Sequence, residues 1–205
     1  MEGPIQTEKK QMEAIRTITT LNHVLKIMKD EHPDDPRNWC NLGTMICFSS
    51  RYNLGDVHDF DSPSEFKEFI NNNKSIVLPL YLYDHSGITI STKPFHSRWD
   101  SGQVGYIYVT LEKAMEELVV KDENEAIDKA VKALMGEVKQ YDHYITGSVY
   151  GFDLKTLNKE TGALEDDDSI WGYYGMDLKQ NGIFSELPNE VQEAITETKD
   201  FSVYA

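Results

Sequence analysis

The chain has 205 residues, enough to bury one sizeable core, and its 40% hydrophobic content is typical of a soluble globular protein. No segment approaches the roughly 18 apolar residues that cross a bilayer, and the N-terminus lacks the apolar segment of a secretory signal. The two cysteines are too few for a disulfide framework or a tetrahedral zinc site. We therefore expect a cytoplasmic protein without a membrane span.

The net charge of −15 is concentrated in the last part of the sequence. Residues 112–205 contain 21 Asp and Glu residues against nine Lys residues, whereas residues 1–111 are almost balanced. Such a field repels nucleic-acid phosphates and anionic membranes, and it attracts basic partners. The alternative is a solvated acidic surface that keeps the protein soluble.

The N-terminal part of the chain predicts one strand between two irregular segments. Residues 1–20 are polar, with Ile15 and Ile18 at a helical spacing, and they predict an arm or a helix. Residues 21–28 predict a strand, with a helix continuing from the preceding segment as the alternative. Residues 30–38 contain two prolines and three aspartates and predict a loop.

A short buried strand is predicted over residues 44–48, and the loop after it leads to a well-marked helix start. Ser62 can cap this helix, Pro63 suits its first position and Glu65 completes a capping box. We expect the helix to end at the asparagines of residues 71–73.

The central segment predicts a hairpin and a third strand. Residues 76–83 form a strand in which Pro79 indicates an edge position or a bulge, because proline donates no ladder hydrogen bond. Residues 84–87 fit a tight turn and residues 88–92 the return strand. A loop then precedes a strand over residues 103–109.

Two helices and a pair of strands follow. Thr110 can cap a helix over residues 111–118, and residues 122–125 form a second capping box. The helix that starts there carries an apolar stripe, made of Ile127, Ala130, Val131, Leu134, Val138 and Tyr141. Residues 148–154 and 169–174 predict paired strands, and a last helix begins near Leu187.

These elements predict an α+β fold, with a mainly antiparallel sheet of about six or seven strands and three or four helices packed largely on one face. Hairpins rather than helical crossovers join several of the strands. We expect residues 1–20 to form a polar arm or helix and residues 21–205 a single domain with a strongly acidic last third.

One candidate pocket lies in the central segment. Asp84 and His85 occupy the hairpin turn, and His96, Arg98 and Asp100 occupy the next loop, so the two loops can meet at one end of the sheet. Two histidines and two carboxylates suit a divalent metal in a small hydrolase, and the arginine suits a nucleotide. No spacing in this segment defines a coordination geometry, and a surface turn with a nearby histidine is the alternative.

Sequence motifs for catalysis do not occur in this chain. It has no Walker loop, no nucleophile elbow and no helical pair of histidines. Cys40 and Cys47 are interpreted as small buried hydrophobic residues. We therefore assign no catalytic residue, no metal ligand and no cofactor, and we favour a binding protein over an enzyme.

Four segments resemble one known family: PRNWCNLGTM (36–45), RYNLGD (51–56), LYDHSG (82–87) and WDSGQVG (99–105). The family consists of uncharacterised proteins encoded by bacteriophages and prophages, and the likeness extends from about Val24 to Gly175. It supplies no activity and no site residue. A phage origin implies a host-cell cytoplasmic protein, and acidic phage proteins of this size often inhibit host defence, as anti-CRISPR proteins and nucleic-acid mimics do.

We therefore predict a phage accessory protein that inhibits a host defence system by protein–protein binding. Its partner would be a host defence protein with a basic nucleic-acid-binding surface, and the chain would not bind nucleic acid or membranes directly. Self-association is left open. Six carboxylates would form the acidic binding face in place of phosphates: Glu116, Glu117, Glu165, Asp166, Asp167 and Asp168. The alternative is the hydrolase or nucleotide-binding module at Asp84, His85, His96, Arg98 and Asp100.

Overall fold

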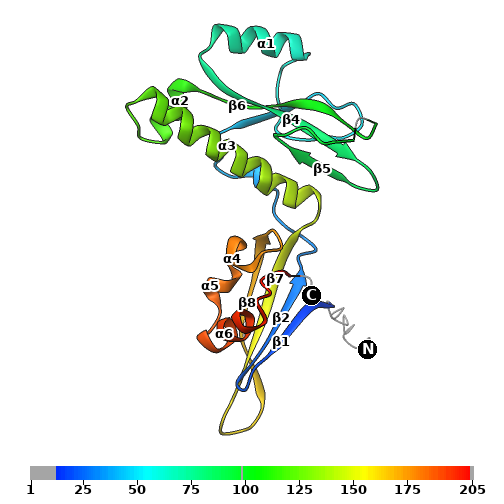
Figure 1. Ribbon diagram of the computed structural model, residues 1–205, viewed down its shortest axis with the longest axis vertical. Coiled ribbons are helices and arrows are strands. Elements are labelled where there is room, and N and C mark those ends of the chain that lie inside the picture. Colours follow the sequence, from blue (N-terminus) through cyan, green and yellow to red (C-terminus); the bar gives the residue numbers. More distant parts are fainter. Residues whose placement is uncertain (1–12, 98, 204–205) are drawn as a thin grey trace, which may run out of the picture. The chain divides into compact units, whose positions relative to one another are not determined.

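The computed structural model describes residues 13–97 and 99–203 of the chain (Figure 1). They form an α+β fold with six α-helices and eight strands, which make two four-stranded antiparallel sheets. The α+β class and the antiparallel pairing are therefore confirmed. The expected single sheet is instead two sheets, each with its own hydrophobic core.

The chain divides into two compact units, whereas the sequence predicted one domain over residues 21–205. Unit 1 comprises the chain up to Pro33 and from Ser148 onward, and unit 2 comprises residues Asp34–Gly147. Strands β2 (His23–Lys29) and β7 (Val149–Leu157) of unit 1 pair with each other, with Lys29 opposite Tyr150. Unit 2 is thus an insertion at the open end of a strand pair.

Unit 1 has the strand order β1-β2-β7-β8, with β1 at Ala14–Thr19 and β8 at Leu164–Tyr174. Its core is built from β2, β7 and three helices, which are α4 (Leu178–Asn181), α5 (Ile183–Glu186) and α6 (Asn189–Thr198). The first two of these helices are short, and the sequence did not predict them.

Strand β1 replaces the arm or helix that the sequence predicted over residues 1–20; residues 1–12 lie outside the described part of the chain. Ile15 and Ile18 both pack against the core of unit 1, although their spacing suits a helix. The pairing of β1 with β2 shifts register between Ala14 and Arg16. An irregularity of this kind reorients the side chains around it, so a spacing of three residues can serve one face of a strand.

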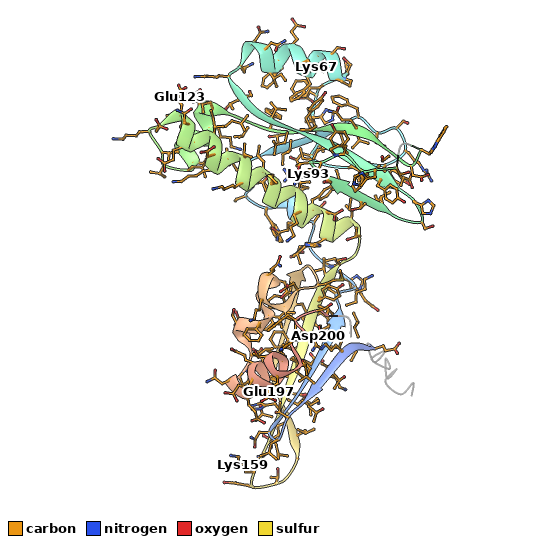
Figure 2. All side chains as sticks on the ribbon, viewed as in Figure 1. Lys67, Lys93, Glu123, Lys159, Glu197 and Asp200 are labelled. Atoms are coloured by element: carbon orange, nitrogen blue, oxygen red, sulfur yellow. The ribbon has the colours of Figure 1, made fainter. Side chains whose placement is uncertain are left out.

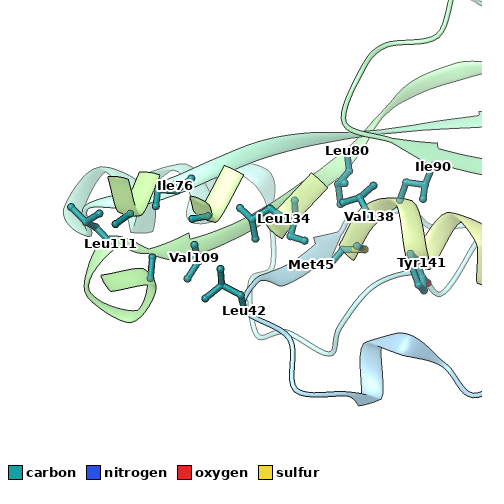
Figure 3. Close-up of a cluster of buried hydrophobic side chains, with 14 of the residues drawn as sticks. Leu42, Met45, Ile76, Leu80, Ile90, Val109, Leu111, Leu134, Val138 and Tyr141 are labelled. Atoms are coloured by element: carbon teal, nitrogen blue, oxygen red, sulfur yellow. The ribbon is translucent and has the colours of Figure 1, made fainter. Parts of the chain in front are cut away.

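Unit 2 has the strand order β3-β6-β4-β5 (Thr44–Cys47, Ser101–Thr110, Ser75–Asp84 and Ile88–Ser91). Helix α3 (Glu123–Ile145) packs through Leu134 and Val138 on one side of this sheet, against the cluster drawn in Figure 3. Helix α1 (Pro63–Asn72) places Phe66 against Tyr106 and Tyr108. These tyrosines alternate along β6 with the core residue Ile107, so α1 covers the opposite face. The helices of unit 2 therefore lie on both faces, not on one.

Local hydrogen bonds confirm the predicted helix starts. Ser62 accepts a hydrogen bond from the backbone N–H of Glu65, and Thr110 accepts one from Lys113 at the start of α2 (Leu111–Glu117). Asp122 accepts one from Glu125 at 2.9 Å and so caps α3. Each cap satisfies a backbone donor that the first helical turn leaves without a partner.

Pro79 lies where β4 is an edge strand. Strand β5 pairs with β4 only from Tyr81 to Asp84, so Pro79 has a strand partner on the β6 side alone. A register shift follows at once, between Leu80 and Tyr81. Both the edge position and the bulge that the sequence predicted are present.

Candidate functional site

Arg37 is the centre of a buried ion cluster in unit 2. Its side chain is 4% exposed, and its Nε and Nη2 donate to the two carboxylate oxygens of Asp56 at 2.7 and 2.6 Å. Its Nη1 donates to Glu137 at 3.1 Å. Burial alone lowers the pKa of the guanidinium, but the bonds to both carboxylates outweigh burial and raise that pKa. Arg37 is therefore charged and occupied by carboxylates, and it is not open to an anionic ligand.

The two carboxylates of this cluster also hold backbone groups. Glu137 Oε1 accepts from the N–H groups of Leu42 and Gly43 at 2.8 and 3.2 Å, and Asp56 Oδ2 accepts from the N–H of Met45 at 2.8 Å. The segments over residues 36–45 and 51–56 are thus tied to each other and to α3. Their main role in this structure is to build unit 2.

Three segments of unit 2 meet at the end of its sheet and form what we call the three-loop rim: residues 49–52, residues 84–87, and residues 96–97 with 99–101. Asp84 Oδ2 accepts from Arg51 Nη1 at 2.6 Å and from the hydroxyl of Tyr52 at 2.9 Å. The bond to Asp84 raises the pKa of the Tyr52 hydroxyl. The backbone N–H of Asp84 donates to the carbonyl of Asp100 at 2.8 Å, which joins the second loop to the third.

The rim brings together three of the five residues predicted for the pocket. His85 Nδ1 lies 3.8 Å from Asp100 Oδ2, and that carboxylate also accepts from Ser97 Oγ at 3.0 Å. Both partners are open to solvent, with 64% of the His85 side chain and 40% of the Asp100 side chain exposed.

Two of the predicted pocket residues do not join this pairing. His96 is exposed, and Arg98 lies outside the described residues. The neighbouring Trp99 is 97% exposed, so it belongs to no core. Arg51 and Tyr52 are the partners that the sequence did not predict. They lie about thirty residues from Asp84 in the sequence, and no local sequence pattern predicts that they bond to its carboxylate.

The chemistry available at these sites is limited. Within residues 13–97 and 99–203, no group of three or more His, Cys, Asp or Glu side chains is arranged to hold a metal ion. Burial raises the pKa of the Cys47 thiol to about 12, so this thiol is protonated at neutral pH and is a poor nucleophile. Cys40 is exposed, which corrects its interpretation as a buried residue.

The six predicted acidic residues belong to different units. Glu116 and Glu117 lie on α2 of unit 2, where Glu117 is 3.6 Å from Lys113 Nζ. The other four, residues 165–168, are consecutive in β8 of unit 1. By sequence, unit 1 carries −8 (17 acids, nine basic residues) and unit 2 carries −7 (18 acids, 11 basic residues). The charge is thus shared between two folded bodies and is not confined to the last third of one domain.

Strands β7 and β8 form what we call the acidic hairpin, residues 153–169, with six acids and two lysines. Every residue from 164 to 169 is exposed. Lys155 Nζ lies 2.7 Å from Asp166, and Thr156 Oγ1 donates to Asp167 Oδ2 at the same distance. Asn158 donates to Glu165 at 2.7 Å near the turn, where Figure 2 labels Lys159. These bonds fix three of the carboxylates along β8, whose pairing with β7 shifts register between Leu154 and Lys155.

Comparison of the chain with protein-family models, with curated proteins and with solved structures found no match. None of the described helices is long and apolar enough to cross a membrane.

Proposed function

We propose that the protein acts by binding, and that the acidic hairpin of unit 1 is the surface that contacts the partner. The partner we propose is a host defence protein that normally holds nucleic acid in a basic channel. Binding there would inhibit the defence system, with the carboxylates of residues 165–168 in place of phosphates. The acids of α2 are left out of this surface because they belong to unit 2.

The observation that carries this proposal is the geometry of β8. It is the terminal strand of its sheet, and its outer edge faces no other strand among the described residues. All four acids of residues 165–168 are exposed, and a register shift opposite Leu154 and Lys155 falls within this stretch. A group of four exposed carboxylates on an open edge complements a group of Lys and Arg side chains.

The choice of partner rests on two further supports. The negative charge of both units disfavours direct contact with nucleic acid and favours a basic protein surface. The resemblance to phage-encoded proteins supports a target in the host cell, where defence nucleases are proteins with such basic surfaces.

The test is affinity capture from host extract, followed by mass spectrometry and by titration of the captured protein. The first variant changes Glu165→Gln, Asp166→Asn, Asp167→Asn and Asp168→Asn together. We expect at least a tenfold loss of affinity, because several close charge pairs would be lost. Affinity for the unchanged chain should fall steeply as salt rises, since these contacts are exposed and screened.

A control that removes two acids elsewhere changes Glu116→Gln and Glu117→Gln on α2, and it should keep the affinity of the unchanged chain. Binding that ignores salt, or that survives neutralisation of the hairpin, would show that the carboxylates are not the contact. Capture of nucleic acid in place of a protein would also contradict the proposal.

A second candidate function uses the three-loop rim as a small-molecule site, with His85 and Asp100 as its polar groups. The observation in its favour is their approach to 3.8 Å beside the exposed Trp99, which offers a surface for stacking a base. We propose testing it by following the imidazole NMR signals of His85 and His96 while ATP or GTP is added. Signals that do not move would remove this candidate.

A further inference from the structure

Unit 2 contains a groove between β5 and the second half of α3. Its volume is about 510 Å³, within the range of small-molecule sites. Ile90 and Val138, which are buried, line it together with the partly buried Phe95 and with Met135, which is 41% exposed. The ring of Phe95 is held by Tyr83, with the ring centroids 5.6 Å apart. The groove therefore has an apolar lining fixed by packing.

Gly136 lies in this groove, in the middle of the 23-residue helix α3. A Cβ atom at this position would meet nothing within 4 Å, in contrast to Gly43 and Gly105, where one would clash with neighbouring atoms. Its φ is not positive either, so backbone conformation does not require glycine. Glycine in a helix interior costs about 0.5–1 kcal/mol relative to alanine, and packing within the described chain does not explain it. Its effect is to leave the groove open.

Three charged side chains line the groove, namely Asp142, Lys93 and Lys139. Asp142 uses one carboxylate oxygen, Oδ1, to accept from Thr89 Oγ1 at 2.6 Å and from the N–H of Ile90 at 2.8 Å, so it caps the edge of β5. Lys93 and Lys139 also line the groove, and Figure 2 labels Lys93. The three charged side chains sum to +1 in a unit whose charge is −7. The groove is thus lined by two lysines and one aspartate in an acidic protein.

We propose that this groove binds a small amphiphilic anion, with an apolar chain against Phe95 and Met135 and a carboxylate at Lys93 and Lys139. Apolar walls with a few charged groups are the usual composition of such sites. The blocked edge of β5 argues against an added peptide strand, because Asp142 already occupies the N–H of Ile90. The site lies in unit 2 and does not depend on the acidic hairpin.

The experiment titrates the full chain with decanoate, and in parallel with decanol as the uncharged probe, by calorimetry and by amide NMR shifts. We expect decanoate to bind at least about tenfold more tightly than decanol, with the largest shifts at residues 89–95 and 135–139. The double change Lys93→Gln and Lys139→Gln should weaken decanoate binding about tenfold and leave decanol unchanged. Gly136→Leu should abolish both by filling the groove.

Lys132→Gln is the matched control, since this exposed lysine of α3 is not part of the groove, and it should bind decanoate as the unchanged chain does. The lysine variants keep the test decisive if Gly136→Leu fails to fold, because they alter only side chains at the mouth. Equal affinity for decanoate and decanol, shifts elsewhere in the protein, or an equal loss in the Lys132 control would each overturn the proposal.

Discussion

At the residue scale, burial decides how much an ion pair contributes to the free energy of unfolding of this protein. Arg37 and Arg51 each place a guanidinium nitrogen 2.6 Å from an aspartate oxygen, but their side chains are 4% and 73% exposed. Removing one partner of a buried pair leaves the other charge uncompensated, whereas an exposed pair is replaced by water.

We therefore expect Arg37→Met to lower the free energy of unfolding of unit 2 by about 3–5 kcal/mol. The same substitution at Arg51 should cost less than about 1 kcal/mol, because its pair with Asp84 is exposed. Urea unfolding followed by circular dichroism measures both. Similar losses in the two variants would contradict the role given to burial.

Glu190 connects α6 to the turn between β1 and β2. Its two oxygens accept from the side chain and the backbone N–H of Asn22 at 2.8 and 3.1 Å, and His23 Nδ1 lies 3.3 Å away. The hydrogen bonds from Asn22, helped by Thr20 and by the nearby His23, lower the pKa of Glu190 from 4.5 to about 2.

A lowered pKa in the folded state gives this carboxylate a stabilising contribution above its ordinary pKa, and that contribution is lost as pH falls from about 4.5 through about 2. We expect the stability of the unchanged chain to exceed that of Glu190→Gln above this window, and the difference to shrink within it. Urea midpoints at a series of pH values test this. Glu193→Gln, an exposed residue of the same helix, is the control and should show no such convergence.

At the scale of elements, the surroundings of a glycine decide whether its replacement by alanine raises or lowers the free energy of unfolding. Gly105 of β6 passes so close to β3 that a Cβ would collide with the carbonyl of Ile46, whereas Gly136 of α3 faces open space. We expect Gly105→Ala to destabilise unit 2 by about 1–3 kcal/mol. Gly136→Ala should stabilise it by about 0.5–1 kcal/mol, since alanine is the better helix former. Thermal unfolding measures the stability of both variants. Two variants that are both more stable, or both less stable, than the unchanged chain would contradict this account.

Elements were also the scale at which the sequence was most informative. The caps at Ser62, Thr110 and Asp122 were correct because each involves a hydrogen bond to the third residue after it. The predicted core face of α3 was correct at Ala130, Leu134, Val138 and Tyr141. It differs at the start of the helix, where Ala126 is buried and Ile127 is 37% exposed. Hydrophobicity alone favoured the larger residue, whereas the fold buries the smaller one next to it.

At the scale of the whole molecule, unit 2 is inserted into the chain between the paired strands β2 and β7. Both ends of the insertion meet there, because the N–H of Asp30 donates to the carbonyl of Val149 at 2.8 Å. Insertions at such sites leave the host domain able to fold, since few contacts depend on the interrupted connection.

We expect a chain of residues 34–147 to fold alone, and a chain that joins residue 32 to residue 149 through a short Gly-Asn turn to fold as unit 1. Dispersed amide NMR spectra that superimpose on those of the full chain would establish both. Spectra typical of an unfolded chain from either piece would show that the units depend on each other. The joined unit 1 also allows the acidic hairpin to be tested separately from the groove of unit 2.

The sequence by itself determined what depends on near neighbours: the α+β class, most strand and helix positions, the three helix caps and the edge position of Pro79. Only the tertiary structure decided what depends on distant ones. Arg37 and Glu137 are 100 positions apart, and Asn22 and Glu190 are 168 apart. A pattern of hydrophobic and polar residues reports which side of an element is buried, but not which core buries it. For that reason the two units, the division of the acidic residues between them and the groove beside Gly136 appeared only in the folded chain.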